Sequence, residues 1–306
     1  MIPISIINNS YNEVKNRLIK RGAQYIDSLD EAIAIDKNRR ETQLERDQIL
    51  SNANKLAKEI GACFKNGEAE KANELKQDSA NLKEKSKDLD LSLKDLEQKL
   101  REVLSSIPNM PYESVPEGSS EKDNEVVRSW GQEPNIDKEA LCHWEVAEKY
   151  DLIDFETGTK ITGAGFPLYK GKGAKLQRAL INFFLDKATE QGYTEMQPPI
   201  LINEDSGFGT GQLPDKEGQM YFVEKDNLYL IPTAEVPVTN IYRGNIINDS
   251  DLPIRMTAYT PCFRREAGSY GKHVRGLNRL HQFDKVEIVE IVKPETSYET
   301  LDNMCS

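Results

Sequence analysis

The stretch PCFRREAGSYGKHVRGLNRLHQFDKVEIV, Pro261–Val289, decides the fold of the second half of this chain. Each end has strand character, and the residues between supply the turn chemistry of a long hairpin loop: Gly268, Ser269, Gly271 and Gly276. The spacing therefore predicts two neighbouring antiparallel strands. Because side chains alternate between the faces of a strand, we expect Arg264 and Glu266 on one face and Phe263 and Arg265 on the other.

The return strand groups Phe283, Lys285, Glu287 and Val289 by the same period of two. If Arg264, Glu266, Phe283 and Glu287 converge, one surface offers a guanidinium, two carboxylates and an aromatic plate. Such a set suits a nucleotide beside a small zwitterion. The guanidinium would face phosphate or carboxylate oxygens, the ring would face a base, and the acids would face ammonium or hydroxyl donors.

Charge supports an anion site in the hairpin. Six Lys or Arg lie between residues 264 and 285, against Glu266 and Asp284, although the whole chain has a net charge of -11. On charge alone, a surface hairpin with solvated side chains remains an equal alternative.

The spacing is more specific than the charge. Phe263-Arg264-x-Glu266, followed by Arg279-x-x-x-Phe283-x-x-x-Glu287, resembles the second signature motif of class II aminoacyl-tRNA synthetases. With HQFDKVE at 281–287 and TAEVP at 233–237, the chain resembles the seryl-tRNA synthetase family in particular. The resemblance implies an α+β fold: an N-terminal antiparallel two-helix coiled-coil arm plus a partial class II synthetase antiparallel sheet with flanking helices.

The resemblance also implies a serine-tRNA ligase, which activates L-serine with ATP and Mg²⁺ to seryl-adenylate and transfers the seryl group to tRNA(Ser). Arg264 is then the expected catalytic residue. The expected L-serine contacts are Thr233, Ala234, Glu235, Arg264 and Glu287. The expected ATP contacts are Arg264, Arg265, Glu266, Arg279 and Phe283, and no residue is assigned to a metal.

Composition bounds the remaining possibilities. The 306 residues allow roughly two domains, and the acidic balance argues against nucleic-acid binding through net charge. Four scattered cysteines and three histidines make a zinc site unfavourable and suit a reducing compartment. The chain has neither a signal peptide at its start nor an apolar run long enough to span a membrane, so we expect a cytoplasmic protein.

The N-terminal part, residues 1–107, is predicted to form a helical arm, and the resemblance implies that this arm binds tRNA. A short helix at 12–22 precedes a long one from Ser28 or Asp30 to Gly61, and residues 61–67 read as a turn. A second helix carries a heptad seam, which predicts a coiled-coil hairpin over about 28–107. Its positions are Ala72, Leu75, Ser79, Leu82, Ser86, Leu89, Leu93, Leu96, Leu100, Val103 and Ile107.

The charges of this second helix nearly cancel. Most of these side chains can therefore also be explained as a solvent-exposed helix face without a binding role. The resemblance implies that the arm holds the long variable arm of tRNA(Ser). Lysines near the tip are the most plausible phosphate contacts: Lys55, Lys58, Lys65 and Lys71.

Prolines and a Gly-Ser-Ser run after Ile107 predict a linker over 108–135. The resemblance implies a class II core over 136–306. We expect helices at 144–150, 176–188 and from about 297, and strands at 166–169 and 228–230. Gly171-Lys172-Gly173 reads as a tight turn without phosphate-loop spacing, and 207–214 reads as a loop. Thr233 and Glu235 also suit simple helix capping.

Residues Gly192–Leu201 resemble the first signature motif of class II synthetases, which forms dimers, so a homodimer is expected. The motif 2 loop, which usually faces ATP or the tRNA acceptor end, departs from the family at Lys272, His273 and Val274, before Arg275. Nothing after Glu287 resembles the third motif. We therefore expect a core incomplete at its C-terminus, and a truncated synthetase with little activity.

Two alternatives remain open. One is a catalytically inactive coiled-coil nucleic-acid-binding or tether module derived from a synthetase. The other is a synthetase-like enzyme that charges a carrier protein. Measuring tRNA binding separately from adenylate formation distinguishes these possibilities.

Overall fold

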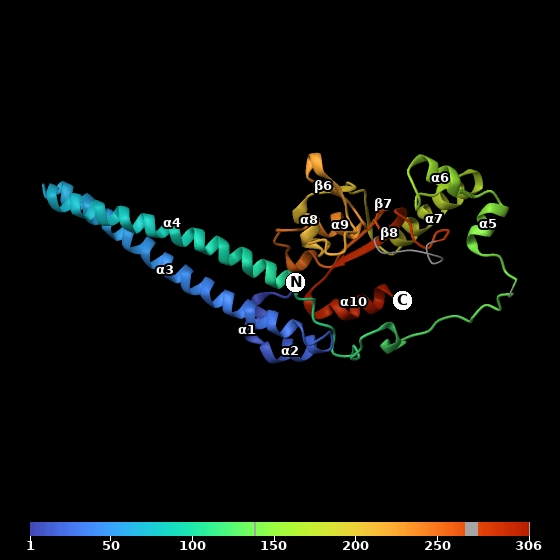
Figure 1. The fold of residues 1–306 in the computed structure, drawn as a ribbon, viewed down its shortest axis with the longest axis horizontal. Helices are drawn as coiled ribbons and strands as arrows, with labels where there is room; N and C mark the ends of the chain where they lie inside the picture. The colour runs from blue at the N-terminus through green and yellow to red at the C-terminus, as the bar shows by residue number, and fades with distance from the viewer. Residues whose placement is uncertain (138, 267–274, 306) are drawn as a thin grey trace. The chain divides into compact units, whose positions relative to one another are not determined.

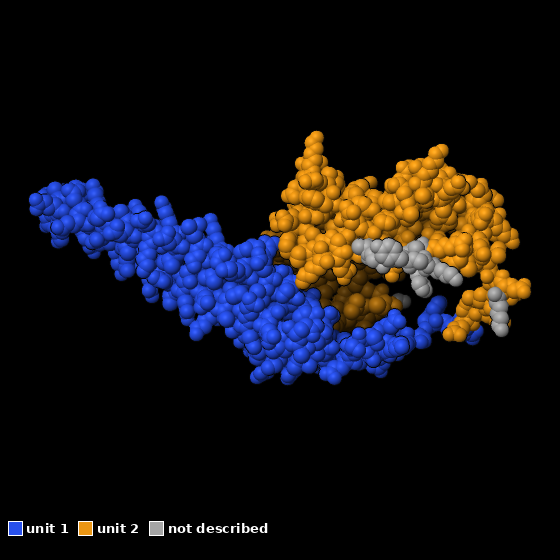
Figure 2. Space-filling view, viewed as in Figure 1, with its two compact units in different colours: residues 1–132 blue, residues 133–306 orange. Residues whose placement is uncertain are grey.

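The computed structural model describes residues 1–137, 139–266 and 275–305 (Figure 1). The chain divides into two compact units, residues 1–132 and 133–306, which Figure 2 distinguishes by colour. Gly268, Ser269 and Gly271 of the expected hairpin turn lie outside the described residues, as do Lys272, His273 and Val274. None of the helices in the described ranges combines the length and the apolar character that a bilayer-crossing segment needs.

Unit 1 is helical. Two short helices, α1 (Ile4–Asn9) and α2 (Tyr11–Ile19), precede the long pair α3 (Tyr25–Lys65) and α4 (Ala69–Ser106). The predicted coiled-coil arm is confirmed as the α3–α4 pair. The predicted turn at 61–67 is wrong in its start, because α3 continues through Gly61 and the chain reverses only after Lys65. One helical glycine costs about 1 kcal/mol, which packing of the paired helix can offset.

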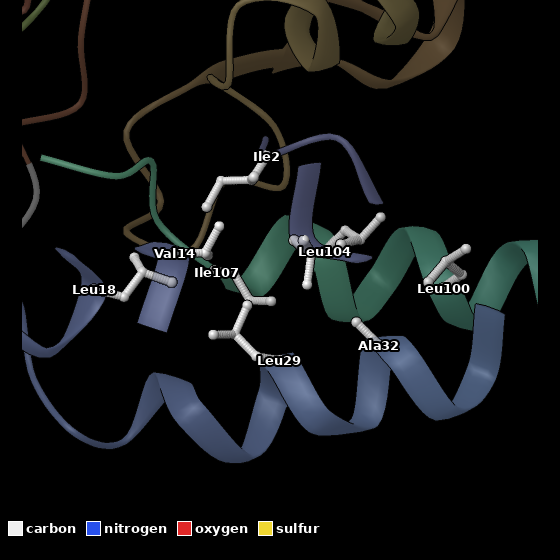
Figure 3. Packing of buried hydrophobic residues seen from close by; sticks show 9 residues of the cluster. Ile2, Val14, Leu18, Leu29, Ala32, Leu100, Leu104 and Ile107 are labelled. Carbon is white, nitrogen blue, oxygen red and sulfur yellow. The ribbon is translucent and has the colours of Figure 1, made fainter. Parts of the chain in front are cut away.

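Apolar side chains form the core at the base of the arm (Figure 3). They come from α1, α2, both long helices and the segments beside them: Ile2, Ile7, Val14, Leu18, Leu29, Ala32, Leu100, Leu104 and Ile107. Burying one such large aliphatic side chain contributes about 1.5–3 kcal/mol, so this cluster anchors the arm at its base.

The seam of α4 has buried residues at every seventh position, as the heptad predicts. Toward the turn they are small, namely Ala72, Ser79 and Ser86, whereas toward the base they are Leu93 and Leu100. The packing at these buried positions therefore becomes more apolar and more extensive from the turn toward the base of the arm.

Asp36 is a buried carboxylate of α3, with its side chain 2% exposed, at the point where an apolar run gives way to a polar one. It accepts from Asn8 Nδ2 at 2.8 Å, from Arg39 Nη2 at 2.8 Å, and lies 3.1 Å from Arg40 Nε. Burial acts to raise the pKa of Asp36, but the hydrogen bonds from Arg39 and Asn8 outweigh burial and lower that pKa. The carboxylate thereby ties α1 to α3.

The described residues of unit 2 form three small sheets. The first has the order β3-β7-β8, with β3 (Thr194–Met196) parallel to β7 (Ile254–Phe263) and β7 antiparallel to β8 (Gln282–Ile291). This sheet is therefore mixed rather than purely antiparallel. The second is antiparallel, in the order β4 (Leu201–Ile202), β6 (Leu228–Leu230) and β5 (Tyr221–Val223). The third pairs β1 (Ile153–Asp154) with β2 (Leu168–Tyr169).

Helices and short turns connect these strands. The helices of unit 2 are α5 (His143–Lys149), α6 (Phe155–Ile161), α7 (Gly171–Glu190), α8 (Glu204–Gly209), α9 (Glu235–Asn240) and α10 (Ser297–Met304). The 3₁₀ turns are η2 (Glu224–Asp226), η3 (Asp249–Asp251) and η5 (Pro294–Thr296), while η1 (Glu121–Asp123) lies in unit 1. The expected loop at 207–214 is wrong in its first residues, which end α8.

The expected tight turn at Gly171-Lys172-Gly173 is also wrong, because these residues begin α7. A Cβ on Gly173 would lie 2.1 Å from the carbonyl oxygen of Leu152, so glycine is needed for close packing of the helix and not for a turn.

The apolar face predicted for 176–188 does fall on α7, but much of it is exposed: Leu176, Leu180, Phe183 and Phe184 are each about half exposed. Leu180 and Phe184 line a groove of about 710 Å³ together with Val286 and Ile288 of β8.

Candidate active site

The β7–β8 pair places the expected site residues by its register. Cys262 lies opposite Phe283, Thr260 opposite Lys285, and Ala258 opposite Glu287. Because residues two apart share a face, Phe283, Lys285 and Glu287 lie on one side of the sheet. The predicted antiparallel hairpin and its grouping of the return strand are therefore confirmed.

Arg264 follows directly after β7 and lies on this same side. Its backbone N–H donates to the carbonyl of His281 at 3.0 Å, which extends the pairing by one residue beyond the strand. Its Nε donates to the carbonyl of Pro232 at 3.3 Å, and its guanidinium carbon lies 5.2 Å from the centroid of the Phe283 ring. The guanidinium and the aromatic plate are thus neighbours, within the range of a cation–π contact.

A buried hydroxyl, an amine and a carboxylate meet beside them. Thr233 Oγ1 donates to Glu287 Oε2 at 2.6 Å, and Lys285 Nζ lies 3.1 Å from Thr233 Oγ1 and 3.2 Å from Glu287 Oε2. Thr233 is 4% exposed. We call Thr233, Lys285 and Glu287 the polar triad.

Lys285 is not among the residues expected at the site from the sequence. The available signal was its position, two residues from both Phe283 and Glu287 on one strand face. The strand period cannot predict the contact between this lysine and Thr233, which lies 52 residues earlier in the chain.

Ala234 and Glu235 follow the triad's threonine at the start of α9. Ala234 is buried, and the backbone N–H of Glu235 donates to Thr233 Oγ1 at 3.3 Å. The carboxylate of Glu235 is exposed. The threonine oxygen therefore accepts one backbone N–H at the start of α9 and also serves the triad, and Glu235 is left accessible at the edge of the site.

Glu266 and Arg279 form a second pair, at the two ends of the hairpin loop. Arg279 Nη1 lies 3.4 Å from Glu266 Oε2, and the side chains are 58% and 13% exposed respectively. Glu266 has φ of 48°, a left-handed conformation that takes it out of the strand period. It therefore does not simply share the strand face of Arg264, as the alternation alone predicted.

Arg265 lies apart from the other expected ATP contacts. Its Nε donates to the carbonyl of Met220 at 3.0 Å, and its guanidinium lies 4.8 Å from the Tyr221 ring centroid. Its backbone N–H donates to the carbonyl of Gln219 at 2.9 Å. The structure thus joins Arg265 to the β5 segment, and we assign it no place beside Phe283.

Below the triad lies a buried thiol. Cys262 is fully buried opposite Phe283, and burial is the main cause that raises the pKa of its thiol. On the other side of the sheet, Tyr259 donates to Asp284 Oδ1 at 2.6 Å, and Gln177 of α7 donates to Asp284 Oδ2. Burial and the bond to Asp284 raise the pKa of Tyr259 to about 12. This back-face network fixes β8 against α7.

The arrangement offers fixed positive charge, an aromatic surface and a hydrogen-bonding triad within a few side chains of each other. A site of this kind can hold an anion and a flat ring next to a small zwitterion. Among the described residues, no group of three or more His, Cys, Asp or Glu side chains is placed to hold a metal ion.

Known proteins match this chain over nearly its whole length. Residues 1–111 match the seryl-tRNA synthetase N-terminal domain family, and residues 221–306 match the tRNA synthetase class II core domain (G, H, P, S and T). The serine--tRNA ligase of Salinibacter ruber is 48% identical over 302 residues, which cover 99% of this chain and 71% of that protein.

Solved structures give the same likeness. A crystal structure of seryl-tRNA synthetase from Pyrococcus horikoshii complexed with ATP has a TM-score of 0.87 and 32% identity, covering 100% of this chain and 72% of that one. The cytoplasmic serine-tRNA ligase of Naegleria fowleri in complex with AMP has a TM-score of 0.78 and 25% identity, covering 100% and 74% respectively.

Proposed function

This chain belongs to the seryl-tRNA synthetase family, and from that premise we propose how its residues divide the work of a serine--tRNA ligase. The reaction joins L-serine to tRNA with ATP as the energy source. ATP binding is supported by the relatives solved with ATP and with AMP. The observation that carries the residue roles is the polar triad lying on the same sheet face as Arg264 and Phe283.

The polar triad would hold L-serine. Glu287 supplies a carboxylate for the ammonium group of the amino acid, and Lys285 offsets the remaining negative charge at 3.2 Å. Thr233 and the accessible Glu235 supply oxygens for the ammonium group or the side-chain hydroxyl, and Ala234 forms the buried backbone between them. A site built to bind a hydroxyl rejects alanine, because its polar groups would then be left unpaired. Threonine is rejected by size.

The ATP side would use Phe283 as a stacking surface for adenine. The guanidinium of Arg264 lies over this ring. When the base stacks on the ring, the guanidinium is free to turn toward the α-phosphate and the serine carboxylate. Glu266 and Arg279 then bind the rest of the nucleotide, with Arg279 the more exposed of the two. Arg265, held at the β5 segment, would act on ATP only indirectly by fixing the backbone next to Arg264.

In the first step an oxygen of the serine carboxylate attacks the α-phosphorus of ATP, and the bond to pyrophosphate breaks. In the second step a ribose hydroxyl at the tRNA 3′ end attacks the seryl carbonyl and AMP leaves. Both transition states gather negative charge on oxygen, which Arg264 would stabilise as a fixed, planar cation. Mg²⁺ would bind mainly through the ATP phosphates, since Mg²⁺ in such sites has few protein ligands.

Unit 1 would supply the grip on tRNA. We propose that residues 1–107 form the tRNA-binding arm, that 108–135 serve as a linker and that the catalytic core lies within 136–306. The exposed lysines at the arm's turn would contact phosphates: Lys55, Lys58, Lys65 and Lys71. The motif 2 loop, which is the hairpin loop between Glu266 and Arg279, would face the acceptor end.

A homodimer would form through motif 1. The supporting observation is the exposed apolar face of α7, the helix that directly precedes motif 1 at residues 192–201, where Leu180, Phe183 and Phe184 are each about half exposed. Several exposed large side chains on one helix are typical of a surface that another protein covers. Analytical ultracentrifugation tests this directly, and a chain that sediments as a monomer at micromolar concentration contradicts it.

Calorimetric titration of the full chain tests the site. We expect ATP and L-serine to bind, L-alanine and L-threonine to bind at least tenfold more weakly, and Glu287→Gln to lose L-serine while keeping ATP. Serine-dependent exchange between ATP and pyrophosphate checks the chemistry of the first step. A chain that binds L-alanine as well as L-serine contradicts the assignment of the polar triad.

A further inference from the structure

The return branch of the hairpin, residues 275–281, has no regular secondary structure. It nevertheless carries Arg279, one of the proposed ATP contacts. The ion pair from Arg279 to Glu266 is 58% exposed on the arginine side, and exposed pairs contribute only about 0–1 kcal/mol. Something else must therefore fix where this arginine lies.

One anchor lies directly after Arg279. Leu280 is buried, and the N–H of His281 donates to the carbonyl of Gly165 at 2.9 Å. The ring of His281 stacks on Phe166 at 5.4 Å between centroids. This end of the branch is therefore tied to the segment between α6 and β2.

The other anchor lies two residues before Arg279 and comes from α5. The backbone N–H of Leu277 donates to Nε2 of His143 at 2.8 Å. Gly276, with φ of 71°, lies so close to this ring that an added Cβ would be 2.2 Å from Nε2. The histidine ring thus lies flush against the branch, and a side chain at position 276 would push the two apart.

The next residue of α5 holds the branch as well. The guanidinium of Arg275 lies 5.1 Å from the ring centroid of Trp144, within the range of a cation–π contact. The rings of His143 and Trp144 meet edge to face at 4.9 Å, so each limits the movement of the other.

Helix α5 is itself fixed to the core of unit 2. Ala147 is buried, its carbonyl accepts from the N–H of Leu152 at 2.8 Å, and the carbonyl of Leu152 accepts from Lys170 at 3.0 Å. Glu145 caps the first turn by accepting from the N–H of Cys142 at 2.7 Å. The two aromatic side chains therefore project from a supported helix.

We propose that His143 and Trp144 are positioning residues for ATP. They hold the backbone of Leu277 and the guanidinium of Arg275, and thereby set the place of Arg279 between two fixed points. The proposal rests on the ATP role proposed for Glu266 and Arg279. Neither aromatic residue need touch the nucleotide, because a contact only two residues upstream leaves Arg279 within about 7 Å of chain reach.

Replacing His143 tests the proposal on the full chain. Leu277 is partly exposed, so water can take over its N–H when the acceptor is removed, and the melting temperature should stay unchanged. His143→Ala should weaken ATP binding about three- to tenfold in calorimetric titration, as expected for one lost hydrogen bond. The affinity for L-serine, bound by the separate polar triad, should not change.

His143→Gln is the conservative variant, because its amide oxygen can accept from the same N–H, and it should restore ATP affinity to within about twofold. Trp144→Leu should weaken ATP binding as His143→Ala does, whereas Trp144→Phe keeps an aromatic face. Lys149→Ala, an exposed change on the same helix, should have no effect.

Three results would overturn the proposal. The first is unchanged ATP affinity in His143→Ala, and the second is an equal loss in His143→Gln. The third is a joint loss of ATP and L-serine binding with a lower melting temperature, which marks a purely structural role. If the unmodified chain binds L-serine but no ATP, the ATP role of Glu266 and Arg279 fails first, and this inference fails with it.

Discussion

The hydroxyl of Thr233 donates a hydrogen bond of 2.6 Å to the carboxylate of Glu287, although 54 residues separate them. The bond joins the start of α9 to the centre of β8, and Lys285 lies within 3.2 Å of both side chains. A carboxylate held in this way keeps one oxygen paired and presents the other to a ligand.

We therefore expect Glu287→Gln to weaken L-serine binding by about 10- to 100-fold. The amide keeps the shape and can still accept from Thr233, but the charge that faces an ammonium group is gone. Calorimetric titration should show ATP affinity unchanged. Equal losses of both ligands would instead indicate a disturbed strand.

The second prediction concerns Phe283 and the guanidinium over it. Phe283→Leu should weaken ATP binding about tenfold, because stacking of a base on an aromatic ring is worth roughly 1–3 kcal/mol. Phe283→Tyr, which keeps the ring face, is the matched control and should bind ATP normally. Full ATP affinity in the leucine variant would exclude the ring as the adenine surface.

A third prediction concerns tRNA and the four lysines at the arm's turn. Replacing all four with alanine should weaken tRNA binding and make the dependence of affinity on salt shallower, because fewer counterions are released. The targets are Lys55, Lys58, Lys65 and Lys71. Matched exposed lysines farther along α4 serve as the control: Lys83, Lys87, Lys94 and Lys99. An equal salt slope in both quadruple variants would place the tRNA contact elsewhere.

Stability of unit 1 should depend on pH through Asp36. Because its folded-state pKa lies below the unfolded value of 3.8, its contribution is present above that value and is lost as the pH falls through the lower folded-state pKa. Asp36→Asn should destabilise the chain by about 1–3 kcal/mol at pH 7. Urea unfolding followed by circular dichroism should show that this difference shrinks below pH 4.

Thiol chemistry supplies a fifth prediction. Cys142 and Cys305 are exposed, whereas Cys63 and Cys262 are buried, and burial raises the pKa of the Cys262 thiol. A thiol reagent at pH 7 should therefore modify two cysteines quickly and leave Cys262 protected until the chain unfolds. Rapid labelling of Cys262, located by peptide mass spectrometry, would contradict its burial beneath the site.

The hairpin could be predicted from sequence because strand alternation is local. The spacing of Phe283 and Glu287 fixed their common face, and Gly276 marked the return of the loop. Thr233, the hydrogen-bond partner of Glu287, could not be predicted in this way. It lies far from Lys285 and Glu287 in the sequence, so no local pattern links it to them. Glu266 departs from the alternation because its backbone adopts a left-handed conformation where the strand ends.

Glycines mislead the sequence interpretation in two places. Gly61 was expected to end the first arm helix, yet the paired helix holds it in helical form. Gly173 is expected in a turn, but it lies in the first turn of α7, where the backbone of Leu152 leaves no room for a side chain. In both cases tertiary packing, which composition does not reveal, decides the local structure.

The gradation of the arm's seam has a mechanical consequence. The small buried side chains of Ala72, Ser79 and Ser86 contribute less apolar area against separation of the two helices than Leu93 and Leu100 do. Bending compliance should therefore rise toward the free end, with the base acting as a clamped support. Backbone amides of the outer turns would exchange with deuterium soonest, and the end that meets a partner could adjust its angle without straining the base.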